Sequence, residues 1–158
     1  MLPIFNRKNK FFFNHYGGLK LKKKILAILL ALPSVSFAKE IKCLSEMAYY
    51  EARGEGTHGI KVVTDVMFNR MKSNQFPDGV CANFRKSGQY STAKMAGGRK
   101  DQELYKKVSE QVESEYAKYR LGDWQDSTSG SLYFNSNGSR PSNKVKFKGK
   151  RGRHFLYG

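Results

Sequence analysis

A glutamate at the end of an apolar helical pattern is the clearest sign of chemistry in this 158-residue chain. At helical spacing, one face carries Leu44, Met47, Ala48 and Glu51. The Glu51 carboxylate must therefore point toward the core or into a cleft beside it. Apolar surroundings disfavour the charged form of a carboxyl group and raise its pKa, which keeps a proton available near neutral pH. The pattern predicts that Glu51 is a general acid.

The same pattern also fits a structural role for Glu51. Ion pairs in the framework of a protein imitate catalytic carboxylates. Arg53 or Arg70 would be the partner of Glu51 in that alternative.

The first 38 residues have the pattern of a secretory signal. A basic flank of Lys20 and Lys22–Lys24 precedes an apolar run over residues 25–37, and Ser36-Phe37-Ala38 fits a small-x-small cleavage site. The run is too short to span a bilayer comfortably, and an uncleaved signal anchor is the alternative. Cleavage after Ala38 leaves residues 39–158, 120 residues in all, which is enough for one compact domain.

Positive charge is concentrated at the C-terminal end. The chain carries a net charge of +16, but residues 1–38 hold seven basic and no acidic residues, so the remainder has 22 basic and 13 acidic residues and a net charge of +9. No acid follows Asp126, and the basic residues there include Arg140, Lys144, Lys146, Lys148, Lys150, Arg151 and Arg153. A patch of one sign predicts an anionic partner, and for an exported domain we expect cell-wall polymers rather than nucleic acid. A merely solvated basic face is the alternative.

Both cysteines lie in the predicted mature domain. Two cysteines in an oxidising compartment predict a disulfide between Cys43 and Cys81, worth roughly 3–4 kcal/mol on the chain-entropy model. Zinc bound by these cysteines with His58 and His154 is the rival reading, but no CxxC or HxxxH spacing supports it. We therefore expect no metal and no other cofactor.

The remaining patterns predict an α+β domain that is mainly helical with a small sheet. A helix from Thr57 or Gly59 to Ser73 carries a broad apolar stripe and should be the central buried helix. A loop follows over residues 76–90, and an amphipathic helix is predicted over residues 101–119. The predicted short strands cover residues 131–135, 144–147 and 154–157.

Six motifs occur in order along this domain. They are Tyr50–Glu55, Gly59–Arg70, Phe76–Cys81, Gly88–Ser91, Ser129–Asn135 and Gly152–Phe155. Together they resemble the cell wall hydrolases of the SleB type, the spore-cortex-lytic family, over nearly all of the mature domain. The chain differs from the family pattern at Tyr90, where Phe is usual, and at Thr92, where Trp is usual.

The resemblance implies a lysozyme-like fold that cleaves the glycan strand of peptidoglycan between N-acetylmuramic acid and N-acetylglucosamine. It implies that Glu51 protonates the oxygen that leaves N-acetylmuramic acid. The residues expected along the sugar groove are Gln89, Tyr90, Ser91, Tyr133 and Asn135. His154 is expected to order the C-terminal segment, with Arg53 and Arg70 in supporting positions.

No second carboxylate stands out in the sequence. Hydrolysing glycosidases need a base or a nucleophile beside the acid, and Glu55, Asp65 and Asp123 are the available residues. A lytic transglycosylase needs one carboxyl group, because that group later accepts the proton of the sugar's own 6-hydroxyl. We therefore expect a monomeric lytic transglycosylase in the periplasm, cell wall or extracellular space. The alternatives are a non-catalytic peptidoglycan-binding module and a secreted cationic protein that binds anionic polymers.

Overall fold

The computed structural model describes the backbone of residues 23–86 and 101–158 and the side chains of residues 36–86 and 101–158. The chain divides into two compact units, Met1–Leu32 and Pro33–Gly158. Helix α1 (Lys23–Ala52) begins in the first unit and ends in the second. Within the described residues, no helix combines the length and the apolar character needed to cross a membrane. The signal segment and its cleavage after Ala38 stay predictions.

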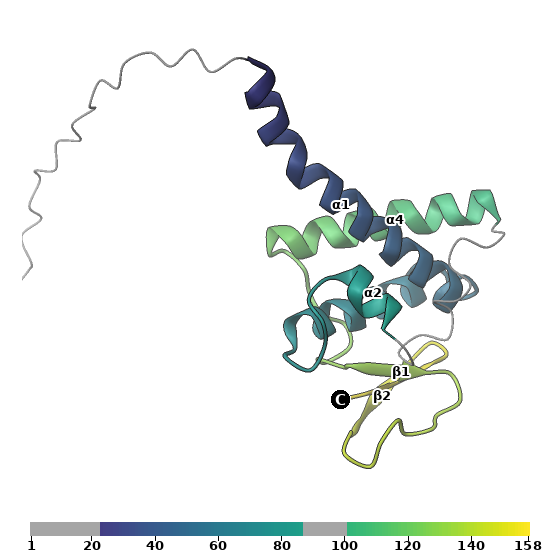
Figure 1. The fold of residues 1–158 in the computed structure, drawn as a ribbon. Helices are drawn as coiled ribbons and strands as arrows, with labels where there is room; N and C mark the ends of the chain where they lie inside the picture. The colour runs from purple at the N-terminus through teal and green to yellow at the C-terminus, as the bar shows by residue number, and fades with distance from the viewer. Residues whose placement is uncertain (1–22, 87–100) are drawn as a thin grey trace, which may run out of the picture. The chain divides into compact units, whose positions relative to one another are not determined.

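The second unit is mainly helical with a small antiparallel sheet, which confirms the predicted fold class. After α1 come the helices α2 (Gly56–Lys72), α3 (Val80–Arg85) and α4 (Gln102–Leu121) and the strands β1 (Tyr133–Asn135), β2 (Phe147–Arg151) and β3 (His154–Tyr157). Helix α2 contacts α4, α3 and strand β1, so it lies between the other helices and the sheet (Figure 1).

Two helical segments are buried on nearly all sides. Every residue from Cys43 to Tyr49 in α1 is buried, and so is every residue of α2 from Gly59 to Phe68 apart from Lys61. One side of α2 packs Val62 and Val66 against Leu156 of the sheet, and its other apolar residues join the larger core with α1, α3 and α4. A helix that is buried all round belongs at the centre of a domain, as the sequence predicted for α2.

Helix α3 forms where the sequence predicted a loop, so that prediction was wrong. The Glu40 carboxylate of α1 accepts hydrogen bonds from the backbone N–H groups of Val80 and Cys81, and the Cys43–Cys81 disulfide spans a Cα–Cα distance of 5.2 Å beside them. Six residues are too few for a helix that persists alone, so α3 depends on these contacts. The predicted disulfide is confirmed, and neither cysteine is available as a metal ligand.

Helix α4 agrees with its predicted range. Asp101 caps its N-terminus by accepting a hydrogen bond from the backbone N–H of Leu104 at 3.0 Å. Gly122 ends it in the left-handed conformation, with φ of 83°. The buried positions of α4 include Val108, Val112 and Tyr116, the stripe that the sequence placed toward the core.

The sheet has the strand order β1-β3-β2 with both pairs antiparallel. Phe134 lies opposite Leu156, and both pack toward α2. Strand β2 begins at Phe147 and continues through Arg151, so its predicted range of residues 144–147 was wrong. Residues 148–151 contain a glycine and three basic residues, a composition common in turns. Pairing with β3 keeps them extended.

Candidate active site

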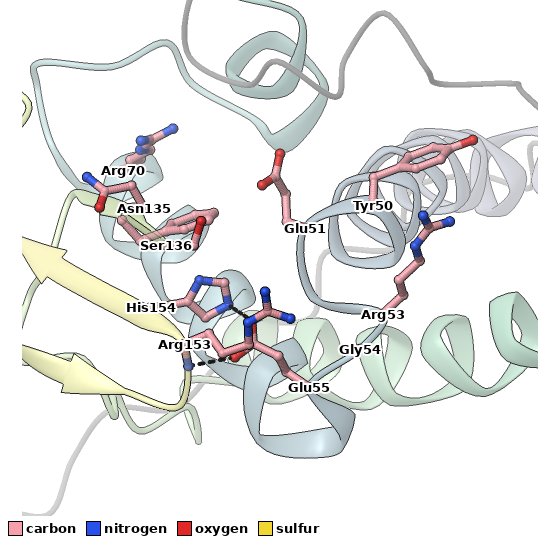
Figure 2. Close-up of a pocket in the computed structure, with 11 residues that line it drawn as sticks. Tyr50, Glu51, Arg53, Gly54, Glu55, Arg70, Asn135, Ser136, Arg153 and His154 are labelled. Atoms are coloured by element: carbon pink, nitrogen blue, oxygen red, sulfur yellow. Dashed lines mark hydrogen bonds and ion pairs between the residues drawn. The ribbon is translucent and has the colours of Figure 1, made fainter. Parts of the chain in front are cut away.

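A pocket of about 530 Å³ lies where the end of α1 approaches α2, the end of β1 and the turn between β2 and β3 (Figure 2). Its volume is within the range of ordinary small-molecule sites. The residues that line it are Tyr50, Glu51, Arg53, Gly54, Glu55, Arg70, Phe134, Asn135, Ser136, Arg153 and His154. Most of these side chains are polar or charged, as expected for a polar substrate.

Glu51 lies in the last turn of α1 and is half-buried. Leu44, Met47 and Ala48 on the same helical face are fully buried, so this face leads from the core to Glu51 as the periodicity predicted. The helix ends at Ala52, and the chain then turns through Gly54 and Gly56, whose φ is 60°. Figure 2 shows the Glu51 carboxylate extending into the space between Tyr50 and the wall formed by Arg70 and Asn135.

Glu55 also lines the pocket, and its carboxylate is bound to the β2–β3 turn. Its Oε2 accepts a hydrogen bond from the backbone N–H of Arg153 at 3.0 Å, and its Oε1 lies 3.1 Å from Nε2 of His154. A Cβ atom at Gly59 would lie 2.3 Å from the Glu55 Cβ, and one at Gly152 would lie 2.8 Å from Oε2. Both glycines are therefore needed to fit the Glu55 side chain into this position.

His154 begins strand β3 and is only 3% exposed. Its ring meets Phe134 edge to face, with the ring centres 5.0 Å apart. Burial lowers the pKa of His154, the Glu55 carboxylate opposes that shift, and the charges of Arg153 and His58 add to it. The imidazole is therefore neutral at neutral pH.

The three arginines of the pocket occupy different environments. Arg70 is buried, donates from Nε to the Leu132 carbonyl at 2.6 Å and packs its guanidinium 4.8 Å from the centre of the Phe76 ring. It therefore attaches α2 to the segment that leads into β1. Arg53 and Arg153 are exposed, so both are accessible to a ligand.

The end of β1 forms a wall of the pocket. Asn135 donates to the Ser139 carbonyl at 2.6 Å and accepts from the backbone N–H of Gly138 at 2.9 Å, which orders the turn after the strand. Asn135 lines the pocket as expected, but Tyr133 does not and packs instead against Phe76 with ring centres 5.7 Å apart. Phe134 and Ser136 were missed, although both adjoin Asn135 at the end of a motif.

The three other residues expected in the sugar groove are Gln89, Tyr90 and Ser91. They lie outside the residues that the structure describes. Their position along the groove stays a prediction.

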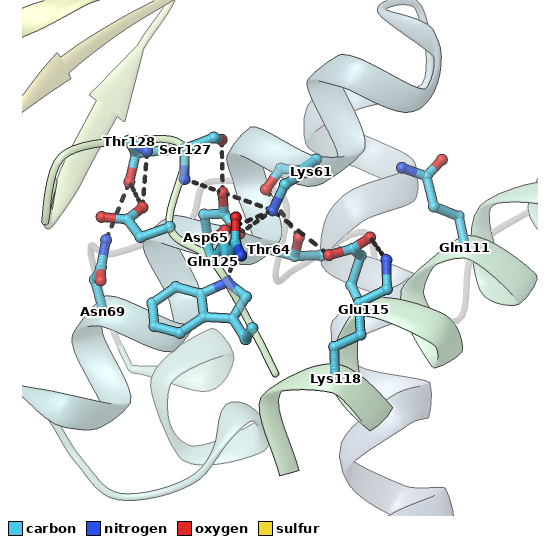
Figure 3. A network of polar contacts seen from close by, with 12 residues as sticks. Lys61, Thr64, Asp65, Asn69, Gln111, Glu115, Lys118, Gln125, Ser127 and Thr128 are labelled. Carbon is cyan, nitrogen blue, oxygen red and sulfur yellow. Dashed lines mark hydrogen bonds and ion pairs between the residues drawn. The ribbon is translucent and has the colours of Figure 1, made fainter. Parts of the chain in front are cut away.

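Asp65 lies outside the pocket, fully buried in a network of polar contacts (Figure 3). It accepts hydrogen bonds from Lys61 at 3.0 Å, from Trp124 Nε1 at 2.7 Å and from Ser127 at 2.8 Å and 2.6 Å. Lys61 also lies 3.5 Å from Glu115 of α4. Asp65 thus connects α2 and α4 to the loop that precedes β1.

That loop contains a second set of hydrogen bonds. Asp126 accepts from the Thr128 backbone N–H at 2.7 Å and hydroxyl at 2.6 Å. Burial acts to raise the pKa of Asp126, but hydrogen bonds from Thr128, Gly130 and Asn69 outweigh it, and the pKa is lowered. Asn69 also donates to the Ser131 carbonyl at 3.2 Å. One helix, α2, therefore positions the segment that carries Asn135.

Of the three further carboxylates considered from the sequence, Glu55 alone lines the pocket. Asp123 is exposed in the loop after α4 and, like Asp65, does not line it. The structure therefore brings together Glu51, Glu55, Arg53, Arg70, Asn135 and His154 from the predicted set.

Enzymes that cleave glycosidic bonds use carboxyl side chains placed beside that bond, and this pocket is lined by two of them, Glu51 and Glu55. The fold is similar to the crystal structure of the catalytic domain of the Bacillus cereus SleB protein, with a TM-score of 0.55 and 22% sequence identity. The similarity covers 74% of this chain and 88% of that one. A comparison with curated proteins finds no match.

The chain belongs to the cell wall hydrolase family, which matches it over residues 54–157. The matched range begins after Glu51 and includes Glu55, Arg70, Asn135 and His154. Family membership makes this a peptidoglycan-degrading domain. Together with the Cys43–Cys81 disulfide, it indicates a location outside the cytoplasm.

Proposed function

We propose that this protein is a lytic transglycosylase that cleaves peptidoglycan between N-acetylmuramic acid and N-acetylglucosamine, with Glu51 as both general acid and general base. The position of Glu51 carries the proposal. It ends a buried helical face and extends its carboxylate into the pocket. General acids of glycosidases need this combination of apolar support and access to the scissile bond.

In the first step, Glu51 donates its proton to the glycosidic oxygen, and the bond between that oxygen and C1 of N-acetylmuramic acid breaks. The sugar passes through an oxocarbenium-like transition state. In the second step, the Glu51 carboxylate accepts the proton of the C6 hydroxyl while the C6 oxygen forms a bond to C1. The products are a 1,6-anhydro-muramyl end and a free N-acetylglucosamine 4-hydroxyl, with no water consumed.

The contacts of Glu55 favour this one-carboxylate reaction. One Glu55 oxygen accepts the Arg153 N–H and the other faces His154. A base that activates water, or a nucleophile that attacks C1, must turn an oxygen toward the sugar, whereas the Glu55 oxygens face the Arg153 N–H and the His154 ring. We therefore propose that Glu55 has a structural role in the site.

Mass spectrometry of digested sacculi tests the proposed reaction. We expect soluble muropeptides that end in 1,6-anhydro-muramic acid, lighter than reducing ends by one water. Products with reducing ends alone would show hydrolysis, and the base would then be sought first at Glu55, the second carboxylate of the pocket. Binding to sacculi without any soluble product would identify a non-catalytic module.

We also propose that the β2–β3 hairpin binds anionic cell-wall polymers. The basic residues Lys144, Lys146, Lys150 and Arg151 are exposed on it and on the segment that leads into it, and Phe147 beside them is 52% exposed. Lys150 Nζ lies 4.7 Å from the centre of the Phe155 ring. A cationic surface of this kind raises the local concentration of an anionic partner. We infer further that residues 1–38 direct export.

A further inference from the structure

Both ring nitrogens of His154 are buried, and neither forms a hydrogen bond within the described part of the chain. Its side chain is 4% exposed, and no group in the described part of the chain forms a hydrogen bond with its Nδ1. Buried polar atoms in native proteins are almost always hydrogen-bonded, so an exception needs an explanation. Because His154 lines the pocket, a ligand in the pocket could supply the missing partner.

The other ring nitrogen, Nε2, faces Glu55 at ion-pair distance without a well-directed hydrogen bond. Nε2 lies 3.1 Å from Oε1 of Glu55, and a carboxylate at this distance favours the tautomer that carries the proton on Nε2. Glu55 is itself fixed, because its Oε2 accepts the Arg153 N–H at 3.0 Å. Burial lowers the pKa of His154 and keeps the ring neutral. A neutral ring with its proton on Nε2 presents Nδ1 as a hydrogen-bond acceptor.

The ring is also placed suitably for contact with a ligand. Figure 2 shows His154 between Glu55 and Ser136, with its second nitrogen on the side turned away from Glu55. The Glu51 carboxylate belongs to the same pocket. A sugar beside Glu51 carries hydroxyl and acetamido N–H groups, which are the donors that a bare imidazole nitrogen accepts.

We propose that His154 is a substrate-binding residue, whose Nδ1 accepts a hydrogen bond from a hydroxyl or acetamido N–H group of the glycan, and that Glu55 is the positioning residue that fixes its tautomer. The inference rests on the proposed function for the identity of the ligand as a glycan. It gives the Glu55–His154 pair a role in recognition and not in proton transfer to the scissile bond.

Two substitutions at His154 distinguish glycan binding through Nδ1 from a structural contact with Glu55 through Nε2. His154→Asn places an oxygen near the position of Nδ1 and removes the contact with Glu55, whereas His154→Gln keeps a donor toward Glu55 and leaves nothing at Nδ1. On soluble uncross-linked glycan strands, we expect His154→Gln to raise KM by roughly three- to tenfold, the loss of about one hydrogen bond, with little change in kcat. His154→Asn should stay closer to the wild type. His58→Gln, at an exposed histidine outside the pocket lining, is the matched control.

A second measurement uses the unmodified protein and does not depend on how the variants fold. Nitrogen-15 NMR of the histidine rings should show His154 neutral and protonated at Nε2, and chitotetraose should shift its unprotonated Nδ1 resonance. A response to chitotetraose alone assigns the acetamido N–H as the donor, and a response to cellotetraose as well assigns a hydroxyl. A proton on Nδ1 in the free protein, or no shift with bound saccharide, overturns the inference.

The outcomes also separate this inference from the proposed reaction. A larger rise in KM for His154→Asn than for His154→Gln would show that His154 acts only through Glu55, and the reaction at Glu51 would be unaffected. Reducing ends in the sacculus digest would overturn the transglycosylase reaction while the saccharide-dependent NMR shift remained.

Discussion

Asp65 and Glu51 are both acidic residues of buried helices, but their surroundings differ. Asp65 is 0% exposed and accepts hydrogen bonds from Lys61, Trp124 and Ser127. Glu51 is half-buried and lines a pocket of about 530 Å³. An acid surrounded by donors from its own helix and from the loop before β1 holds these two elements together, whereas an acid at a pocket is accessible to substrate. The comparison supports a structural role for Asp65 and agrees with the catalytic role that we propose for Glu51.

The two sites also differ in how their neighbours are arranged. The Asp65 network joins α2, α4 and the loop before β1 through contacts within the protein (Figure 3). The pocket includes the exposed Arg53 and Arg153 and a histidine nitrogen that has no partner among the described residues. Polar groups that are hydrogen-bonded within the protein stabilise the fold, whereas polar groups that line a pocket are available to a ligand.

The largest expected effect is at Glu51. Glu51→Gln keeps the size and shape of the side chain and removes the transferable proton, so we expect sacculus cleavage to fall by ~10² or more. The midpoint of thermal unfolding should hardly change. Initial rates of sacculus clearing and a melting curve measure the two quantities.

Glu55→Gln is the matched comparison for that loss, because Glu55 lines the same pocket. It should reduce cleavage less than Glu51→Gln does. A folded Glu51→Gln protein with wild-type cleavage would exclude Glu51 as the acid, and the reverse ranking would make Glu55 the acid.

Asp65→Asn should show the opposite pattern. The carboxylate of Asp65 accepts hydrogen bonds with both oxygens, but an amide has only one oxygen, so its NH₂ must face one of the donors and that hydrogen bond is lost. A hydrogen bond to a charged group contributes about 2 kcal/mol. We expect the free energy of unfolding to fall by about 2 kcal/mol, with cleavage per folded molecule retained. Urea denaturation and activity measured well below the melting temperature check both parts.

Asp123→Asn is the control for Asp65, because Asp123 is exposed. Its effect should stay within about 0.5 kcal/mol. Equal stability of the Asp65→Asn protein, or loss of cleavage in a fully folded sample, would contradict the division between the two sites.

The smallest effect is expected at the hairpin. Neutralising Lys144, Lys146, Lys150 and Arg151 to Gln should weaken binding to sacculi severalfold at low salt and little at high salt, because salt screens exposed charges. Cleavage of short soluble glycans should hardly change. Sedimentation with sacculi at two salt concentrations measures the binding.

The same number of exposed charges can be removed from α4 as a control. Lys106, Lys107, Lys118 and Arg120 are exposed there and lie outside the pocket lining. If both sets of substitutions weaken binding equally, net charge and not the hairpin attracts the protein to the wall.

Local patterns in the sequence determined much of the helical framework. The face of α1 that ends at Glu51, the buried helix α2 and the amphipathic helix α4 follow from apolar spacing and from the residues at their ends. The Cys43–Cys81 disulfide followed from the number of cysteines in a domain expected to be exported. These features depend on short stretches of chain or on composition, which a sequence displays directly.

Contacts between distant segments decided the rest. Helix α3 needs Glu40 and the disulfide, and strand β2 needs its pairing with β3. The Glu55 carboxylate and the Arg153 N–H that it accepts are 98 positions apart. No periodicity relates residues at such separations, so the sequence named Glu55, Asp65 and Asp123 as equal alternatives. Only folding places Asp65 in a network, Asp123 in solvent and Glu55 beside His154, because burial and hydrogen-bond partners are properties of the packed chain.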